Sequence, residues 1–410
     1  MTGVDIDHIV SLVFFLSAMM LFIGLFISTI QTGITYQQNN AVASRCSDLI
    51  DNILLSPGIP SQWGQTDDAP AGFGLQDAGF TQYQLSPFSL MRLRSSMGAT
   101  VNYAMTGQYY SNISMGFGQS LLVPHSQALN YSAVSSLLGV NGSYGFSLTL
   151  TPILNITISP QLQNPLTFSI GVTGPGFPLA NANVECYLIT VDCQVEGTYP
   201  QYQNRTGSAV TDSAGNASLS FSGVDGSTTS FALIACAHQS GLVGMGYYSK
   251  VLYNTSYVIP LVSSIENETA ILAHSWDVTG EGDSDAALYY NATFIVLAAD
   301  FNFLEMRLSN STGSAAGLLL SGQVPELAYD TLTLGTHSSG ILVVSYSAGA
   351  ETGIVVMPWG LSSLAFPVTF GGDPSSRNWV AVDLRQVMVG GIAYQAKLSV
   401  WSFGMYQVSG

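Results

Sequence analysis

Acidic side chains capable of holding a metal ion gather in one short stretch, Asp-Val-Thr-Gly-Glu-Gly-Asp-Ser-Asp. Its carboxylates belong to Asp277, Glu281, Asp283 and Asp285. Alternate carboxylates on a Gly-bearing loop could wrap Ca²⁺, which takes about six to eight oxygen ligands. The spacing differs from that of an EF-hand, so further ligands would have to come from elsewhere. A solvated acidic loop is the alternative interpretation.

Motifs for catalysis are missing from the sequence. The five histidines lie far apart and none belongs to a His-Glu-x-x-His motif. A Gly-x-Ser-x-Gly elbow and a Walker loop are also absent. We therefore expect a protein that is not an enzyme and that uses no cofactor, apart from the Ca²⁺ considered above.

The four cysteines show neither a Cys-x-x-Cys pair nor a zinc-like spacing. Cys186 and Cys236 lie in two apolar stretches that are typical of strands and could face one another across a sandwich. Because an extracellular site permits oxidation, we predict that Cys236 pairs with Cys186 or Cys193. A hairpin bridge between Cys186 and Cys193 is the alternative, and Cys46 is expected to be a buried free thiol.

Ten Asn-x-Ser/Thr sequences follow one another along the chain. Several would arise by chance in a chain rich in Asn, Ser and Thr. All ten nevertheless lie on the C-terminal side of a long apolar segment, which favours an outward-facing body that carries N-linked glycans. The acceptor residues are Asn112, Asn130, Asn141, Asn155, Asn204, Asn216, Asn254, Asn267, Asn291 and Asn310.

That apolar segment, Ile9 to Ile30, has 22 residues and no charged side chain. A transmembrane helix needs about 20 such residues. A cleaved signal peptide is the alternative, but it would carry a shorter apolar region of about 7–15 residues with positive charge in front. Here Asp5 and Asp7 precede the segment, and the Ala-x-Ala sequence at 41–43 lies far beyond it. We expect a retained single-pass anchor.

The helix is predicted to run from about residue 8 to 55, because an apolar stripe with helical spacing continues past the membrane. Ser56-Pro57-Gly58 then ends it. The stripe needs a partner, either its own head or neighbouring stalks, and its members are Val42, Cys46, Leu49, Ile50, Ile53 and Leu54.

Small residues within the membrane segment could let helices from several copies approach one another. They are Ser17, Ala18, Gly24 and Ser28. The expected partners are therefore the membrane and copies of the same chain. Nucleic acid is excluded, because the net charge is −16 and no run of Lys or Arg exists to neutralise phosphates.

Charged residues make up 8% of the sequence, against about 25% in ordinary soluble proteins. Hydroxyl and amide side chains fill the surface role instead. The 20 tyrosines would suit stacking on sugars, but they would equally suit β-sandwich surfaces and subunit interfaces.

The rest of the chain is predicted to be mainly β, with two or three β-rich domains after the helix of residues 1–58. A mixed α+β head spans 59–157, with short helices at 86–93 and 132–138 and strands at 144–151 and 153–158. Residues 158–258 form an Ig-like sandwich and 259–410 a C-terminal β domain. The final hairpin, turning at Gly390-Gly391, could complete the first head domain, which would make the sandwich an insertion.

The first 155 residues or so carry ordered motifs after the amphipathic helix, among them Leu-Leu-Ser-Pro-Gly-Ile-Pro-Ser-Gln-Trp-Gly (54–64), Leu-Ser-Pro-Phe-Ser-Leu (85–90) and Tyr-Gly-Phe-Ser-Leu-Thr-Leu-Thr-Pro (144–152). In this order the chain resembles archaeal surface proteins anchored by a type IV pilin-like, class III N-terminal segment. The resemblance implies a β-rich head outside the cell and a relation to surface filaments. The family's peptidase cuts after a basic and a small residue, whereas Thr2-Gly3-Val4 lacks the basic one.

Residues 172–184 and 207–221 are similar to invasin-type bacterial Ig-like domains and to carboxypeptidase regulatory-like sandwiches. Both contain a hairpin of the form Thr-Asp-x-x-Gly-x-Ala, here beginning at Thr211. Asp212 is expected to bond the turn backbone and Gly215 to supply a left-handed position.

Two classes of function follow. The first is a membrane-anchored extracellular structural protein, a pilin-like subunit of a surface filament or layer that assembles through its N-terminal helix. The second is a cell-surface adhesin or receptor module that binds a glycan or peptide.

Overall fold

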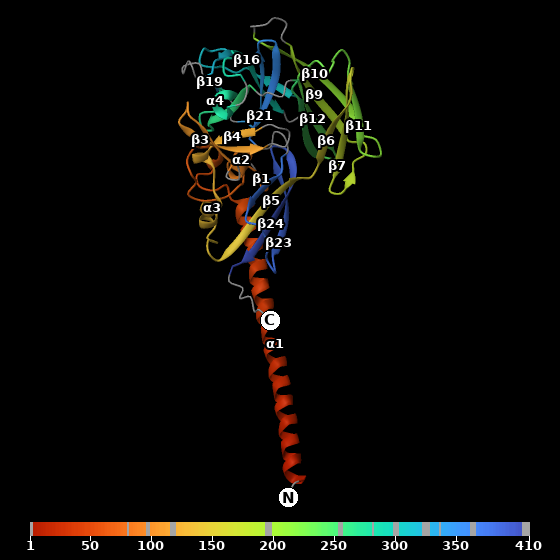
Figure 1. The fold of residues 1–410 in the computed structure, drawn as a ribbon. Helices are drawn as coiled ribbons and strands as arrows, with labels where there is room; N and C mark the ends of the chain where they lie inside the picture. Colours follow the sequence, from red (N-terminus) through yellow and green to blue (C-terminus); the bar gives the residue numbers. More distant parts are fainter. Residues whose placement is uncertain are drawn as a thin grey trace.

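The computed structural model describes residues 3–79, 82–95, 99–114, 120–192, 199–252, 257–280, 283–297, 303–321, 329–335, 338–360 and 366–403. A long helix, α1 (Gly3–Leu55), stands below a body built mainly of strands, as Figure 1 shows. The mainly β class with a long apolar N-terminal helix is confirmed. α1 ends at Leu55, the predicted place. Three residues later Gly58 takes a φ of +83°, and an added Cβ there would lie 2.7 Å from the carbonyl oxygen of Gly72, so this turn requires glycine.

The sheet nearest to α1 joins the middle of the chain to its end. Its strand order is β1-β23-β24-β5-β22. The strands are β1 (Gln84–Leu85), β5 (Tyr144–Pro152), β22 (Val368–Gly371), β23 (Ala381–Val389) and β24 (Ile392–Ser402). β24 pairs antiparallel with the whole of β5, and β23 and β24 turn at Gly390-Gly391 as predicted. The C-terminal hairpin therefore shares a sheet with residues 144–152.

Short helices accompany this sheet. They are α2 (Pro87–Ser95), α3 (Tyr131–Leu137) and the 3-10 turns η1 (Trp63–Gln65) and η2 (His125–Gln127). Ser86 caps α2 as predicted, because its hydroxyl accepts a hydrogen bond from the Ser89 amide at 3.3 Å. Asn130 caps α3 in the same way, through the Ala133 amide at 2.8 Å.

Two further sheets lie above. The six-stranded sheet, ordered β19-β15-β14-β4-β3-β2, contains β2 (Ala99–Tyr103), β3 (Gln108–Ser114), β4 (Ser120–Pro124), β14 (Val258–Ser264), β15 (Thr269–His274) and β19 (Tyr329–Thr333). The five-stranded sheet, ordered β17-β16-β20-β21 with β18 also on β16, contains β16 (Leu288–Leu297), β17 (Phe303–Met306), β18 (Ala316–Leu319), β20 (Gly340–Ala348) and β21 (Glu351–Trp359). The short helix α4 (Ser275–Thr279) follows β15.

The predicted sandwich is formed by two sheets, β10-β9-β12-β13 and β11-β7-β6, with β8 on β7. Their strands are β6 (Asn155–Gln163), β7 (Leu166–Gly174), β8 (Phe177–Pro178), β9 (Asn183–Asp192), β10 (Gln201–Val210), β11 (Asn216–Phe221), β12 (Phe231–Gln239) and β13 (Leu242–Lys250). The side chains between the two sheets form a separate hydrophobic core, whose buried members run in sequence from Ile156 to Ala237. Asp212 Oδ1 accepts from the amides of Ala214 and Asn216, and Gly215 has a φ of +76°, as the turn motif predicts.

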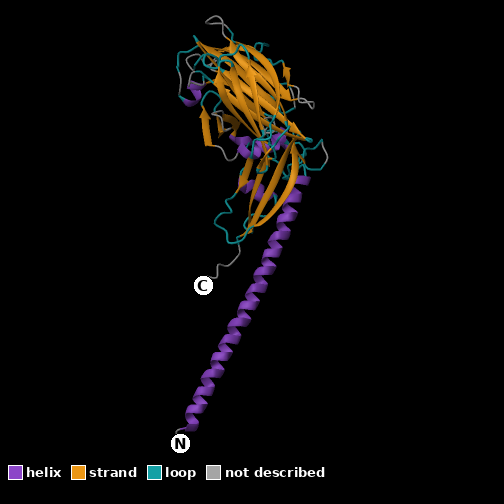
Figure 2. Cartoon of the chain, turned by 90° about the vertical axis from the view of Figure 1, so that its right-hand side faces the viewer, coloured by secondary structure: helices purple, strands orange, loops and turns teal. Residues whose placement is uncertain are grey.

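The sandwich is stacked on the five-stranded sheet, so strands in the middle of the body are covered on both faces. On β12, Phe231 and Leu233 point into the sandwich core, whereas Ala232 and Ile234 join the main core. β21 packs against β12 and β9 on one side and against β14 and β4 on the other. Burial on both faces accounts for the continuous apolar runs in these strands. Figure 2 shows the strands as one body above the helix.

Residues 59–157 and 259–410 share sheets and one core instead of forming two separate domains, in line with the alternative in which the C-terminal strands complete the head. Within residues 59–157, β4 pairs with β14 at Leu122 and Leu261, and β5 pairs with β24. A single hydrophobic core contains buried side chains from these strands, and its members range in sequence from Val42 on α1 to Val400 on β24. The described body therefore has a main core built from both ends of the chain, and a sandwich with a separate core inserted between them.

Candidate functional site: the N-terminal helix and its junction with the body

The upper end of α1 is docked on the body. The six residues of the predicted stripe are at most 3% exposed, and the helix packs against β23 and β24. The partner of the stripe is therefore its own body. Each large apolar side chain buried in this way contributes about 1.5–3 kcal/mol.

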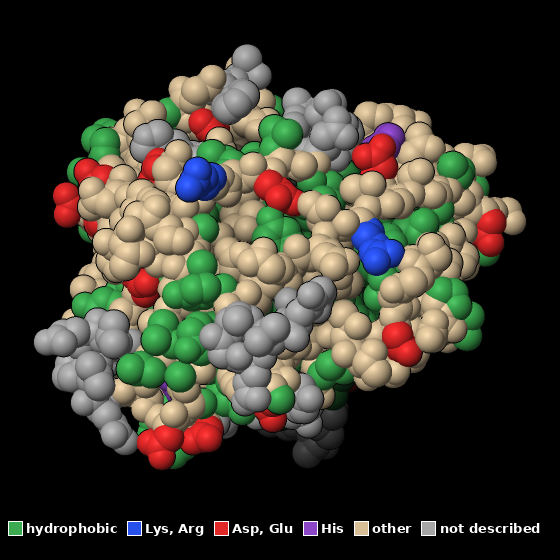
Figure 3. Space-filling model, turned by 90° about the horizontal axis from the view of Figure 1, so that it is seen from above, with side chains coloured by type: hydrophobic (Ala, Val, Ile, Leu, Met, Phe, Trp, Pro, Cys, Tyr) green, Lys and Arg blue, Asp and Glu red, His purple; other side chains and the backbone are tan. Residues whose placement is uncertain are grey.

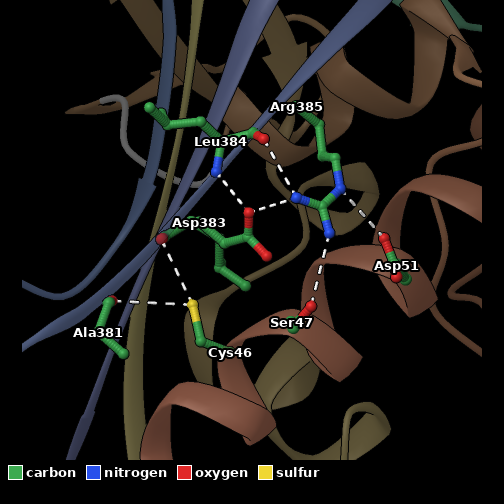
Figure 4. Close-up of polar contacts among 8 residues, drawn as sticks. Cys46, Ser47, Asp51, Ala381, Asp383, Leu384 and Arg385 are labelled. Atoms are coloured by element: carbon green, nitrogen blue, oxygen red, sulfur yellow. Dashed lines mark hydrogen bonds and ion pairs between the residues drawn. The ribbon is translucent and has the colours of Figure 1, made fainter.

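Polar contacts fix the helix at the edge of this junction (Figure 4). On β23, Arg385 forms an ion pair with the neighbouring Asp383, and its Nε lies 3.4 Å from Asp51 Oδ1 on α1. Arg385 Nη2 also donates to the Ser47 hydroxyl at 3.5 Å. Although partial burial opposes the charge, the carboxylates of Asp383 and Asp51 raise the pKa of Arg385. Exposed pairs of this kind contribute about 0.2–1 kcal/mol, so they orient α1 more than they hold it.

Cys46 lies inside the same junction. Its Sγ is 3.7 Å from the carbonyl oxygen of Ala381 and 3.6 Å from that of Leu398, contacts that suit a weak S–H donor. Burial, together with the charge of Asp383, raises the pKa of Cys46 to about 11. The thiol stays protonated at neutral pH, and the prediction of a buried free cysteine is confirmed.

Below the junction, α1 is exposed from Asp7 to Gln38. Large apolar side chains there face outwards; Phe14 is 73% exposed and Met20 is 74% exposed. This part of α1 is long and apolar enough to cross a membrane. The hydroxyls of Ser17 and Thr29 donate back to carbonyls one turn earlier, each at 2.8 Å, so these groups are satisfied without water.

The predicted small residues are all exposed on this part of the helix. Ser17, Gly24 and Ser28 are separated by seven and four residues, so they share one face, and Ala18 lies beside it. Seven-residue steps from Ser28 continue the same face through Thr35 to Val42. The small residues are therefore on the side of α1 that docks on the body higher up.

The acidic loop does not assemble the predicted calcium ligands in its described part. Asp277 lies in α4, and Asp283 Oδ1 accepts a hydrogen bond from the Asp285 amide at 3.0 Å. Glu281 lies outside the described residues. Among the residues that are described, no three His, Cys, Asp or Glu side chains are grouped closely enough to hold a metal ion.

The predicted disulfide between Cys186 and Cys236 is wrong, because both are buried free thiols. β9 and β12 are neighbours in one sheet, where Cys186 is paired with Ala235 and Cys236 with Glu185. Successive residues of a strand point to opposite faces, so Cys186 faces the sandwich core and Cys236 the main core. The same free thiols contradict a bridge from either residue to Cys193, which itself lies outside the described residues.

The sequons differ in accessibility. Asn112 and Asn291 are half-buried, Asn254 lies outside the described residues, and six acceptors are exposed: Asn130, Asn141, Asn155, Asn204, Asn216 and Asn267. Asn310 is the exception, since it is 8% exposed. Its Nδ2 donates to Tyr290, Ala316 and Asp330. Asn310 is therefore a structural residue, and its prediction as a glycan acceptor is corrected.

A polar cluster around Glu305 was not predicted from the sequence. Glu305, on β17, accepts hydrogen bonds from Tyr187 and Asn204, and from Tyr202 at 2.7 Å. Burial opposes ionisation, but these three donors outweigh it and lower the pKa of Glu305. Tyr187 lies on β9, and Tyr202 and Asn204 lie on β10, so the cluster ties the sandwich to the five-stranded sheet. A single Glu between apolar residues gave no signal for this contact, which joins positions about 100 residues apart in sequence.

No protein-family model matches the chain, and no curated protein matches it in sequence. A transglutaminase from red sea bream is among the solved structures found to be similar, with 8% sequence identity and a TM-score of 0.18. The match covers 62% of this chain and 37% of the transglutaminase. A TM-score this low carries no statement about fold or activity.

Proposed function

We propose that this protein is a membrane-anchored extracellular structural subunit that assembles through α1, in the manner of a pilin-like subunit of an archaeal surface filament or layer. The observation that carries the proposal is the helix itself. From Ile9 to Ser44 it has no charged residue, and down from Gln38 to Asp7 none of its residues is covered by the described part of the body.

Residues 31–40 support assembly most directly; their sequence is Gln-Thr-Gly-Ile-Thr-Tyr-Gln-Gln-Asn-Asn. At about 1.5 Å per residue they extend the helix about 15 Å beyond the apolar segment. Gly, Thr and Asn are weak helix formers, and no ion pairs between neighbouring turns compensate for them. Ile34 is 50% exposed and Tyr36 is 68% exposed. Packing against the same segment of other copies would supply the burial that a lone helix lacks here.

The surface of the body supports an extracellular, non-catalytic role in this proposal. Seen from above, it consists mostly of uncharged polar and apolar groups with scattered charged side chains (Figure 3). Six exposed sequons would allow glycans to cover it. Neutral hydroxyl and amide surfaces also lose no charge when the pH of the surroundings changes.

Two substitutions test assembly through α1. Gly24→Leu places a large side chain on the small-residue face, where helices would need to approach closely. Gly33→Leu makes the same change on the opposite face, and an added Cβ meets nothing within 4 Å at either position. Electron microscopy of cell-surface preparations should show shorter or fewer fibres, or a broken lattice, for Gly24→Leu only. Assembly that is unchanged by Gly24→Leu, or equally weakened by both variants, would contradict the proposed interface.

A further inference from the structure

A groove lies along the seam between the sandwich and the five-stranded sheet. Two of the strands that line it, β10 and β16, are labelled at the end of the body far from α1 in Figure 1. Its volume is about 750 Å³, within the range of about 300–1,000 Å³ found for sites that bind small molecules. β10 forms one wall with residues 201–204, and the other wall consists of residues 291–293 of β16 and residues 305–308, at the end of β17 and just after it. The groove is separate from the helix on which the proposed assembly depends.

Side chains that both donate and accept hydrogen bonds dominate the lining. Asn204 and Asn291 bring amides, and Tyr202 and Thr293 bring hydroxyls. Glu305 and Arg307 contribute one charge of each sign, so the lining has no net charge. This composition suits a neutral ligand with many hydroxyl groups, since each hydroxyl also donates and accepts.

Aromatic rings adjoin the polar lining. Tyr289 lies two residues before Asn291 on β16, on the same face of the strand. Its ring packs against that of Tyr199 with centroids 5.6 Å apart, and Tyr199 remains 47% exposed. An exposed aromatic ring beside amides and a carboxylate offers the apolar face of a sugar ring a surface on which to pack.

The groove is also held in shape before any ligand arrives. Tyr202 donates to Glu305 at 2.7 Å and Asn204 donates to the same carboxylate, so β10 and β17 are tied together beside the groove. Such a fixed arrangement lowers the entropy lost on binding.

From this geometry we propose that the groove binds a short, neutral saccharide. Two sources would supply that chemistry: a free or neighbouring glycan, or the protein's own N-linked glycan. The second is feasible because Asn291 and Thr293 of the sequon Asn291-Ala-Thr293 line the groove. Among the described residues, the Asn291 side chain makes no hydrogen bond, whereas that of Asn204 is engaged with Tyr187 and Glu305.

The first arm of the test uses the full chain in detergent, made in a host without N-glycosylation. The probes are neutral di- to tetrasaccharides of glucose, mannose, galactose and N-acetylglucosamine, followed by saturation-transfer NMR at up to about 10 mM. We expect one class to bind, with about tenfold weaker binding in Asn291→Leu and Tyr199→Ala. Asn216→Leu, a matched change of an exposed sequon residue on β11, should bind as the unchanged chain does.

The second arm uses the chain made in a host that glycosylates Asn-x-Ser/Thr sites, and asks by peptide mass spectrometry whether Asn291 carries a glycan. A glycan seated in the groove should slow hydrogen exchange in residues 201–204, and Asn291→Gln should abolish that protection while Asn216→Gln should not. Binding in the first arm identifies an external saccharide, and protection in the second identifies the chain's own glycan. The proposal is overturned if no probe binds in a way that Asn291→Leu weakens and no Asn291-dependent protection appears.

Discussion

Glu305 illustrates how a single side chain can hold two parts of this protein together. It is one of the few charged residues, and three donors from the sandwich converge on it. A carboxylate bound by several donors is favoured in its ionised form, which is why its pKa is lowered despite partial burial. The seam between the two cores therefore depends on an ionised group.

We predict that Glu305→Gln destabilises the body at pH 7 by about 1 kcal/mol, the usual scale for a lost hydrogen bond. Because the folded-state pKa of Glu305 is lowered, its stabilising effect is present above the ordinary pKa of about 4.3 and is lost as the pH falls further. Thermal unfolding measured from about pH 7 to pH 2 should therefore show that the variant loses less stability on acidification than the unchanged chain does.

The exposed Glu266→Gln serves as the control and should leave both the midpoint and its acid dependence unchanged. An identical acid loss in Glu305→Gln and in the unchanged chain would show that the seam does not depend on this carboxylate.

Considered as an element, α1 is a continuous helix with two different environments. Its last turns are buried against β23 and β24, while the preceding residues down to Asp7 are exposed. The helix face that carries Val42 and Ile53 where the body covers it carries Ser17, Gly24 and Ser28, with Leu21 among them, where it does not. A neighbouring helix packed on the small residues would therefore lie beneath the body that α1 itself carries.

The two environments predict that truncating an isoleucine of α1 to alanine strongly destabilises the body at one position and hardly affects it at the other. Ile50→Ala removes a side chain that is 0% exposed and should lower the unfolding free energy of the body by about 2–5 kcal/mol. Ile34→Ala removes one that is 50% exposed and should leave this free energy nearly unchanged. Urea unfolding of the full chain in detergent, followed by tryptophan fluorescence, measures both. A similar loss in the two variants would mean that the docked end of α1 contributes little to the body.

At the level of the whole molecule, the stacked sheets account for the low content of charged residues. Strands such as β12 and β20 are covered on both faces, so they read as apolar runs, and the described ion pairs are both formed by Arg385. The stability of the body thus rests on apolar burial and hydrogen bonds more than on ion pairs.

Because the main core begins at Val42, the body should fold without the exposed part of α1. Deleting residues 1–40 is expected to give a soluble, monomeric and β-rich protein, with a thermal midpoint close to that of the full chain. Size-exclusion chromatography and circular dichroism check this outcome. If the truncated protein still forms the fibre or lattice of the full chain, the bodies drive assembly and α1 is only a tether.

Local chemistry was enough to predict several features of this protein. The end of α1 at Leu55, the cap at Ser86, the turn from Asp212 to Gly215 and the hairpin at Gly390-Gly391 all follow from residues within a few positions of one another. Pro, Gly, Ser and Asp act on the neighbouring backbone, so their effect does not depend on how distant segments meet. The apolar segment from Ile9 to Ile30 is equally local, since its length and composition alone make it able to span a membrane.

Contacts between distant segments were settled only by the tertiary structure. In the pairing of β9 with β12, Cys186 lies opposite Ala235 and Cys236 opposite Glu185, so the two thiols point into different cores. No pattern in either strand specifies this register. The burial of Asn310 and the donors around Glu305 likewise depend on strands far apart in sequence. The stripe on α1 required a partner, but an apolar face binds any complementary surface, so only the pairing of β24 with β5 placed the body's own sheet against it.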